Sequence, residues 1–458
     1  MKHCLLVLIL PFSFHFRLLA SNETGDAKEK CNGVLGLESQ RAVGAAVAKL
    51  GLTLLEKLQP GSEQPNIIIS PLSVSLALAE LALGAKNNTE EKLLEVLHAK
   101  ELPHFHETLS CLQEQLTAKA VKMASRLYLI PEGYTVNQDY VDRALNLYKS
   151  ESAQLTSIED VNRWVEETTS GQITNFMSSL PPNVVLMLIN AIHFKGEWQS
   201  RFNSKYTKKD IFYIDRKTSV KVDMMMGSQY PLSMFVDRTD STQVARFPFQ
   251  GNMSLLVIMP RPQHENLSHV AAKLNISDMY EHFPRERSMH VTLPKFKIEY
   301  KQDLRQALTS MGLGFLFTGP DLSKMAPGPL VVSGVQHASN MELSEEGAEA
   351  SAATSFTLVR TISTFAVNMP FIFALVDDTS YTPLFLGIVT NPNPGATTEQ
   401  SDDPKTETES TRKSSKDPMS DGTLNDGPHQ NMLSYMLNMW KETVPQQFLG
   451  HQEMEDGN

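Results

Sequence analysis

The chain has 458 residues, of which 41% are hydrophobic and 20% are charged, and this composition is typical of a globular protein. At about 150 residues per domain, its length allows two or three domains. Its net charge of −11 at pH 7 disfavours nucleic acids and other polyanions as partners, because these bind through clustered basic side chains.

The first 20 residues have the features of a secretory signal peptide. Lys2 precedes an apolar run over residues 4–14, and Ala20 offers a small side chain for cleavage, although basic residues interrupt the end of the run. No other stretch is apolar over about 18 residues, so the sequence predicts neither a transmembrane helix nor a membrane partner. We therefore expect a secreted, extracellular protein with a short polar extension over residues 21–34.

Two kinds of covalent modification are expected of a secreted chain. Removal of the signal would leave two of the three cysteines, and an even number in an oxidising compartment predicts a disulfide between Cys31 and Cys111. The alternative is two free thiols. Five N-x-S/T sequons are candidate glycosylation sites: Asn22, Asn87, Asn252, Asn266 and Asn275.

Helices are predicted at three places along the chain. Apolar residues recur at helical spacing over 43–58, and Pro60 with Gly61 should end that helix. Ser70 is a good N-cap and Pro71 suits a first helical turn, so a helix should begin there; because the run that follows is apolar nearly all round, this helix should be buried. Residues 158–177 read as an amphipathic helix that Gly171 could interrupt or end.

Strands are predicted mainly in the second half of the chain. The continuous apolar run over 184–194 suits a central strand buried on both faces. Strands and helices alternate without strict order and no internal repeat is seen, which favours an α+β fold. The further predicted strands are 219–226, 243–249, 254–259, 290–293, 371–376 and 384–389.

Residues 342–364 are the least ordinary stretch of the chain. Over residues 348–356 the sequence alternates as in a strand with one buried face. The residues on that face are nearly all small, so such a strand would bury little surface. Two glutamates and Gly347 precede this pattern, as at a flexible hinge. The stretch ends near Arg360, its only basic residue. A strand that could insert into a sheet but need not is unusual in a stable core.

This stretch resembles the reactive-centre loop of the serpins, a family of serine protease inhibitors. Four further segments resemble serpin signatures: 66–73 (NIIISPLS), 190–198 (NAIHFKGEW), 368–373 (NMPFIF) and 383–387 (PLFLG). The resemblance covers about residues 35–396 and therefore implies one large domain. It implies the α+β serpin fold, with a main five-stranded sheet, further β-sheets, about nine helices and an exposed reactive-centre loop. It also supports the Cys31–Cys111 pairing.

The resemblance assigns a role to individual residues. It implies that a trypsin-like protease, with plasmin as the leading candidate, attacks the reactive bond Arg360–Thr361 and that the freed loop inserts beside residues 335–342. The loop is about one residue shorter than in most inhibitory serpins, where the count would place the bond after Thr361. The remaining expected positions are a hinge (Gly347, Ala348, Glu349, Ala350), a polar cluster called the shutter (Ser70, Ser73, Asn190, His337) and the breach tryptophan Trp198.

The sequence favours inhibition over two other functions, those of a non-inhibitory serpin and of an enzyme. A non-inhibitory serpin that acts as a carrier or chaperone is the alternative, but the small residues of the loop favour insertion. An enzyme is not expected, because no nucleophile elbow or acid accompanies His337. Neither a metal nor another cofactor is predicted: after His104, His106 and Glu107, the zinc-helix motif would require a histidine where Ser110 stands. We expect a monomer.

The C-terminal tail, residues 397–458, differs in composition from the rest. Residues 397–430 are polar and should be disordered, because they cannot bury enough surface to offset ordering entropy. Apolar residues over 432–440 recur at helical spacing, either as a short binding helix or as a cluster with no partner. In the resembling family member, tail lysines dock on kringle modules of plasmin, and the candidates here are Lys405, Lys413, Lys416 and Lys441. Acidic residues in 101–120 make heparin activation unexpected.

Overall fold

The structure is a computed structural model that describes residues 36–61, 64–117, 121–129, 135–150, 153–180, 184–237, 241–260, 267–347 and 363–400. Several predictions fall outside these ranges. They concern the signal peptide and extension, the strand over 348–356, the tail beyond residue 400, and the following site residues: Asn22, Cys31, Asn266, Ala348, Glu349, Ala350, Arg360 and Thr361.

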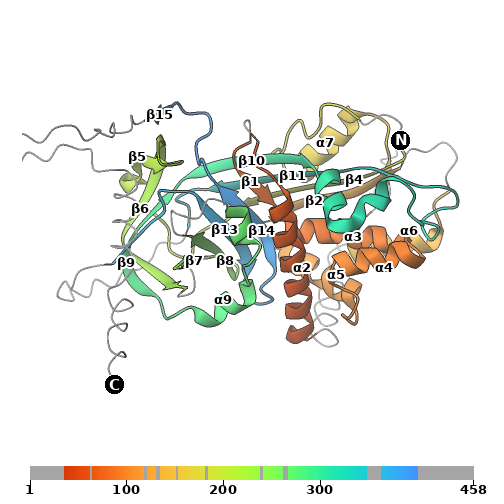
Figure 1. Cartoon of the computed structure of the whole chain (residues 1–458), viewed down its shortest axis with the longest axis horizontal. Helices are drawn as coiled ribbons and strands as arrows, with labels where there is room; N and C mark the ends of the chain where they lie inside the picture. The colour runs from red at the N-terminus through yellow and green to blue at the C-terminus, as the bar shows by residue number, and fades with distance from the viewer. Residues whose placement is uncertain are drawn as a thin grey trace, which may run out of the picture.

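A five-stranded sheet forms one half of the molecule, with strand order β10-β11-β4-β2-β3. Its central pair, β11 and β4, is parallel, whereas β10 and β2 flank that pair in antiparallel fashion. Figure 1 shows these strands side by side across the upper part of the view. The bounds are β2 Val121–Leu129, β3 Ala153–Gln154, β4 Leu186–Lys195, β10 Phe296–Asp303 and β11 Val332–Leu343.

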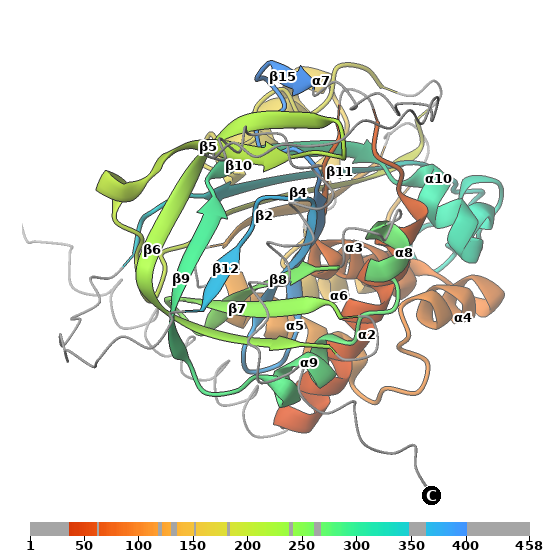
Figure 2. The ribbon, with the colours of Figure 1, turned by 60° about the vertical axis from the view of Figure 1, so that its left-hand side comes forward.

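The other strands form a second, ten-stranded assembly in the order β1-β14-β13-β8-β7-β6-β9-β12, with β5 and β15 paired to β6. Figure 2 shows how the long strand β6 bends around this half. The bounds are β1 Ile67–Ile69, β5 Lys208–Tyr213, β6 Thr218–Val236, β7 Gln243–Phe249, β8 Met253–Met259, β9 Arg287–Pro294, β12 Thr364–Ala366, β13 Phe371–Asp377, β14 Pro383–Val389 and β15 Thr398–Gln400.

Nine α-helices lie within the described ranges. In Figure 1, α2 to α6 gather on one side of the five-stranded sheet and α7 lies on the other. We call the α7 side the front of this sheet and the α3 side its back. The bounds are α2 Leu37–Lys57, α3 Pro71–Gly84, α4 Asn87–Val96, α5 Phe105–Thr117, α6 Gln138–Tyr148, α7 Ile158–Thr168, α8 Leu267–Ala271, α9 Ile276–His282 and α10 Arg305–Leu308. No helix in the described ranges is long and apolar enough to cross a bilayer.

Helix α3 begins as its sequence predicts. The Ser70 side chain accepts a hydrogen bond from the Ser73 backbone N–H, and Pro71 occupies the first helical position. Every residue of α3 is buried. The helix packs against β4 and β2 and so forms the back support of the five-stranded sheet. The prediction of a helix before Pro60 is also confirmed, by α2.

Helix α7 is shorter than predicted, because it ends at Thr168 rather than near Met177. The Thr169 hydroxyl donates to the Val165 carbonyl and accepts from the Ile173 N–H, and Gly171 adopts a left-handed φ of 76°. These features turn the chain out of the helix. Residues 172–177 then run without regular structure, and we call this segment the strap. The helix itself packs on the front of the sheet through a core cluster that includes Val161, Val165, Ala191 and Ala338.

The predicted strands are present, with small changes in length. The strand predicted over 184–194 is β4, and the one predicted beside the loop over 335–342 is β11. The strand over 219–226 is the first part of β6, which continues to Val236. Those over 243–249, 254–259, 290–293, 371–376 and 384–389 are β7, β8, β9, β13 and β14.

One prediction about the tail is wrong at its first residues. Residues 397–430 were expected to be disordered, but Thr398–Gln400 form strand β15, which pairs antiparallel with β6. A salt bridge of 2.8 Å joins Glu399 to Lys221 of β6. The pairing uses backbone groups, so three exposed polar residues can extend a sheet edge without burying apolar surface. The folded body therefore extends at least to Gln400.

Candidate functional site

The site is the seam between β11 and β4 and the two ends of the predicted reactive loop. Within the described residues, β11 and β4 pair directly, from Val332 opposite Leu186 to Glu342 opposite Lys195. No strand separates them. The chain leaves this seam at Gly347 and returns at β12, which pairs with β9 of the other sheet. The predicted loop thus starts beside the seam and ends on a different sheet.

Trp198 anchors the first end of the loop. Its backbone N–H donates to the Glu346 carbonyl over 2.9 Å, and its indole Nε1 donates to the Ser344 carbonyl over 2.6 Å. The ring is fully buried and stacks on Phe249 at a centroid distance of 4.1 Å. Strand β11 therefore ends against a fixed aromatic cluster, at the position predicted for the breach.

Gly347 forms a parallel β-bridge with Trp198. A Cβ added to Gly347 would lie 2.4 Å from the Trp198 carbonyl oxygen, a distance that real Cβ atoms do not tolerate. The sequence suggested glycine here for the freedom of a hinge. The structure gives a second reason, which is the close approach of two backbones.

The four residues predicted to form the shutter lie together on the back of the seam. The Ser70 backbone N–H donates to His337 Nε2 over 3.2 Å, and His337 Nδ1 lies 3.0 Å from Asn190 Oδ1. The Asn190 amide donates to the Ser73 carbonyl over 2.8 Å. His337 belongs to β11 and Asn190 to β4, so this chain of hydrogen bonds crosses the seam and ends on α3.

The geometry fixes His337 as a neutral structural residue. Because Nε2 accepts from a backbone N–H, Nδ1 must carry the proton and donate to Asn190. Burial lowers the pKa of His337 to about 3, and the neutral ring satisfies both contacts. Neither nitrogen is bonded to a serine hydroxyl, so the arrangement is not that of a catalytic serine and its base.

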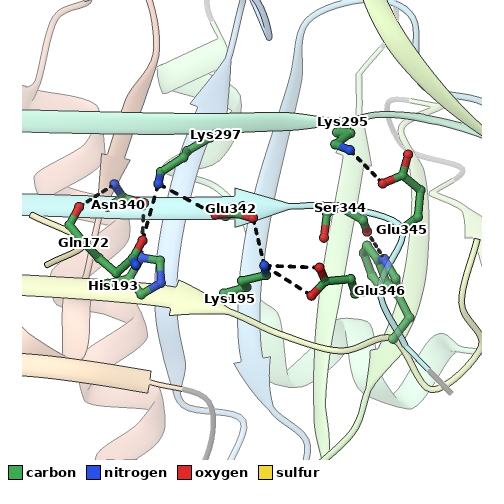
Figure 3. Close-up of polar contacts among 11 residues, drawn as sticks. Gln172, His193, Lys195, Lys295, Lys297, Asn340, Glu342, Ser344, Glu345 and Glu346 are labelled. Atoms are coloured by element: carbon green, nitrogen blue, oxygen red, sulfur yellow. Dashed lines mark hydrogen bonds and ion pairs between the residues drawn. The ribbon is translucent and has the colours of Figure 1, made fainter. Parts of the chain in front are cut away.

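A second histidine–asparagine pair crosses the seam on the front, and it was not predicted. His193 of β4 stands directly opposite Asn340 of β11, and His193 Nδ1 lies 3.1 Å from Asn340 Oδ1. Both side chains are buried. The Asn340 amide also donates to the Gln172 carbonyl of the strap over 3.1 Å. Figure 3 shows these contacts at its left and the charged residues Lys195, Glu345 and Glu346 to their right.

Lysines and glutamates continue this row toward Trp198. Lys195 of β4 lies 3.2 Å from Glu342 of β11 and 3.2 Å from Glu346, and these hydrogen bonds raise the pKa of Lys195. Lys295 lies 2.9 Å from Glu345. Partial burial acts to raise the pKa of Glu345, but hydrogen bonds from Lys295 and Thr207 outweigh it and hold the pKa below its ordinary value. All five of these charges are paired (Figure 3).

The remaining predicted sites are only partly described. Cys111 on α5 is disulfide-bonded, but Cys31 lies outside the described residues, so their pairing stays a prediction. The sequon residues Asn87, Asn252 and Asn275 are exposed. No group of three or more His, Cys, Asp or Glu side chains that could hold a metal ion occurs within the described residues.

Comparison with known proteins agrees with this geometry. The family described as Serpin (serine protease inhibitor) matches residues 45–392. Alpha-2-antiplasmin from Bos taurus is 41% identical over 380 residues, which cover 82% of this chain and 77% of that protein. Alpha-2-antiplasmin from Mus musculus is 41% identical over 375 residues, covering 80% and 76%. A crystal structure of uncleaved ovalbumin is similar with a TM-score of 0.69 and 27% identity, covering 76% of this chain and 100% of that one.

The chain therefore belongs to the serpin family. The predicted α+β serpin fold is confirmed, including its main five-stranded sheet. The chain is 41% identical to alpha-2-antiplasmin of both species over about four-fifths of its length.

Proposed function

We propose that the protein is a secreted inhibitor of trypsin-like serine proteases, with plasmin as its first target, and that it is not itself an enzyme. Three facts support this proposal: membership of the serpin family, 41% identity to proteins named alpha-2-antiplasmin, and an arginine at the predicted reactive position. An arginine guanidinium matches the aspartate at the base of a trypsin-like specificity pocket, where charge-assisted hydrogen bonds form.

The proposed reaction begins as an ordinary proteolysis. The protease serine attacks the Arg360 carbonyl, an ester to the serine forms, and the Arg360–Thr361 amide bond breaks with Thr361 leaving as a free amine. The freed segment then adds as a strand between β11 and β4 and carries the acylated protease with it. Inhibition requires that insertion be faster than hydrolysis of the ester.

The observation that carries the proposal is the pairing of β11 with β4 directly beside the start of the loop. A strand added between them would form backbone hydrogen bonds with both neighbours. The sheet with the inserted strand would therefore be more stable than the closed sheet. Small side chains over 348–353 suit such an insertion, because they can pass through the opening and pack without large rearrangement.

The test is to mix the full chain with plasmin and with trypsin and to look for an adduct that survives SDS. We expect a one-to-one adduct with both proteases and none with Arg360→Ala. If the parent protein forms no adduct with any trypsin-like protease, inhibition is refuted and the carrier or chaperone alternative gains. An adduct that persists in Arg360→Ala would move the reactive bond elsewhere.

A variant of the loop tests insertion apart from recognition. Ala350→Arg leaves Arg360 unchanged but brings a charge to a position expected to face the core after insertion, where burial costs several kcal/mol. We expect cleavage after Arg360 with release of active protease, measured as a rise in the stoichiometry of inhibition. Ala353→Arg, on the other face of the predicted strand, is the matched control and should be milder.

Two further parts of the proposal concern the termini. We infer that Cys31 pairs with Cys111, and peptide mapping without reduction would test this bond.

We also infer that lysines of the C-terminal tail, such as Lys405 and Lys441, dock on kringle modules of plasmin. Deleting residues 401–458 should then slow association with plasmin but not with trypsin, which has no kringles. Equal rates for the full and shortened chains with plasmin would refute the docking role.

A further inference from the structure

The front of the β11–β4 seam carries two consecutive polar pairs, each between residues that stand directly opposite in the strand register. His193 faces Asn340, and two residues further Lys195 faces Glu342. The first pair is joined over 3.1 Å and the second over 3.2 Å. Below them on the same face Ala191 faces Ala338, where α7 packs. The polar pairs therefore cross the front of the seam at its end nearest Trp198 (Figure 3).

Asn340 also joins the seam to the strap. Its Oδ1 lies against His193 of β4, while its Nδ2 donates to the Gln172 carbonyl. Lys297 of β10 reinforces this arrangement, since its ammonium donates to Gln172 Oε1 over 3.4 Å and lies 3.8 Å from Glu342. One buried amide thus connects β4, β11 and the segment that follows α7, as Figure 3 shows.

Insertion of a strand must break the direct contacts across the seam. Neighbouring strands lie about 4.8 Å apart, so a strand placed between β4 and β11 would separate them to roughly 9.6 Å. His193 and Asn340 could no longer share a hydrogen bond at that separation. Both are buried, with 5% and 2% of their surfaces exposed, so each would lose a partner without gaining free access to water.

We propose that His193 and Asn340 form a clasp on the front of the seam that limits how fast β11 and β4 separate. Both are positioning residues, because they act through the strands rather than on the protease. The inference rests on the proposed function, in which loop insertion competes with hydrolysis of the acyl-enzyme. It adds to that function the residues that set the rate of opening on this face.

The charged pairs above the clasp contribute less to this rate. Across the seam, Lys195 is 40% exposed and Glu342 is 24% exposed, so water and salt screen their attraction more than that of the buried pair. On the back of the seam, His337 and Asn190 are also bonded to α3, and changing them would disturb the helix as well as the seam. The buried front pair is therefore the one whose removal acts most directly on opening.

The experiment measures opening without any protease. A synthetic peptide with the sequence of residues 348–358 is incubated with the full chain, and its incorporation is followed by native gel and by the rise in the unfolding temperature. Asn340→Ala removes both bonds of the clasp. The matched control is Gln336→Ala, which truncates an amide on the same face of β11 opposite the hydrocarbon side chain of Ile189.

We expect Asn340→Ala to incorporate the peptide about tenfold faster than the parent, which corresponds to a barrier lower by about 1.4 kcal/mol. Gln336→Ala should stay within about twofold of the parent. His193→Ala removes only the bond to Asn340 and should accelerate incorporation by no more than Asn340→Ala, which also removes the bond to Gln172. The double variant should be no faster than Asn340→Ala, because His193 acts in the clasp only through Asn340. His193→Gln restores a donor to Asn340 Oδ1 and should return the rate to within about threefold of the parent.

Two results would overturn the clasp. One is an unchanged rate of incorporation in both Asn340→Ala and His193→Ala, and the other is an equal acceleration by Gln336→Ala. If Asn340→Ala fails to fold, His193→Ala and its Gln counterpart carry the test alone. The protease assay separates the two claims: an adduct with unchanged peptide rates refutes the clasp alone, whereas accelerated incorporation without any adduct refutes the inhibitory function and leaves the clasp in place.

Discussion

The β11–β4 seam and the β8–β13–β14 region are both buried between layers of the same fold, yet they are held together in different ways. Strands β8, β13 and β14 are buried at every residue and consist almost entirely of large apolar side chains. The seam strands also carry large apolar side chains, but these are interrupted by alanines and by hydrogen-bonded His, Asn and Ser side chains. Interlocked hydrocarbon resists separation at every point, whereas a few directional bonds can be broken in steps.

The difference indicates which half of the molecule is built to move. In the apolar region, parting two strands would open cavities along their whole length. On the front of the seam, the alanine pair Ala191 and Ala338 leaves less to disentangle, and the polar pairs hold the strands in register until they separate. The strand insertion proposed above requires this second kind of contact.

The largest expected effect breaks the apolar region. Phe373 of β13 is fully buried, so Phe373→Ala should destabilise the protein by about 3–5 kcal/mol through lost burial and a cavity. Urea unfolding measures this change. Among molecules that remain folded, the stoichiometry of inhibition should stay near that of the parent, because the seam is unaltered. A large rise in stoichiometry at unchanged folded fraction would contradict the division between the two regions.

A buried carboxyl away from the seam sharpens the comparison. Glu80 of α3 is 3% exposed, its Oε1 has no hydrogen-bond partner among the described residues, and burial raises its pKa to about 7 from 4.5. The folded state therefore holds the proton more tightly than the unfolded one. The resulting stability is full below pH 4.5 and is lost as the pH rises to about 7.

Glu80→Gln removes this titration. A shift of about 2.5 pKa units corresponds to roughly 3 kcal/mol, so the variant should gain that much relative to the parent between pH 4 and pH 8. Unfolding free energies of both proteins at the two pH values give this double difference, in which other groups cancel. If the unfolding free energies of parent and variant change equally between pH 4 and pH 8, burial of Glu80 does not destabilise its ionised form. Peptide incorporation should not change, because polarity outside the seam does not hold it closed.

The third prediction concerns the back of the seam. Asn190→Ala leaves His337 Nδ1 without its acceptor in a site that is 1% exposed, which should cost about 1–3 kcal/mol of stability. Thermal unfolding measures the loss. The matched variant is Ile192→Val, which changes the same strand by one methylene and should cost about 1 kcal/mol. If Asn190→Ala is as stable as the parent while Ile192→Val loses about 1 kcal/mol, the back hydrogen bonds contribute nothing to the closed sheet.

The smallest expected effect lies at the exposed end of the seam. Lys195→Met removes two ion pairs of a lysine that is itself 40% exposed, with partners that are 24% and 59% exposed, so stability should change by less than about 1 kcal/mol. The difference from the parent should shrink further in about 1 M salt, where charges are screened beyond roughly 3 Å. A loss above 2 kcal/mol that persists in high salt would mean that charge, rather than the buried pair, closes the upper seam.

Much of the fold could be predicted because its strongest signals are local. Strand β4 is a continuous apolar run, and the start of α3 is set by Ser70 and Pro71. Strand β11 is different: it carries Ser, Gln, His and Asn in a buried position, so hydropathy does not identify it. Only its resemblance to a known family placed it. Strand β10 was not predicted, although its sequence alternates as a half-buried strand does and Phe296, Ile298 and Tyr300 are buried.

The candidate site divides in the same way. The back cluster was predicted from family motifs, whereas the front pair was not, because His193 and Asn340 are 147 residues apart and meet only in one register of two strands. Strand β15 was missed for a related reason, since its pairing is made by backbone groups that leave no trace in side-chain polarity. The end of α7 depends on a single threonine hydroxyl and a left-handed glycine, and helical periodicity does not report either.

The contact between Gly347 and Trp198 has a consequence for inheritance. Every missense change that a single base can make in a glycine codon introduces a side chain with a Cβ, and here that atom would lie 2.4 Å from a backbone oxygen. The Trp198 backbone would have to shift, and its bond to the Glu346 carbonyl would shift with it. No codon neighbour of this glycine is therefore mild, and natural variants at position 347 should be rare in any population that depends on the protein.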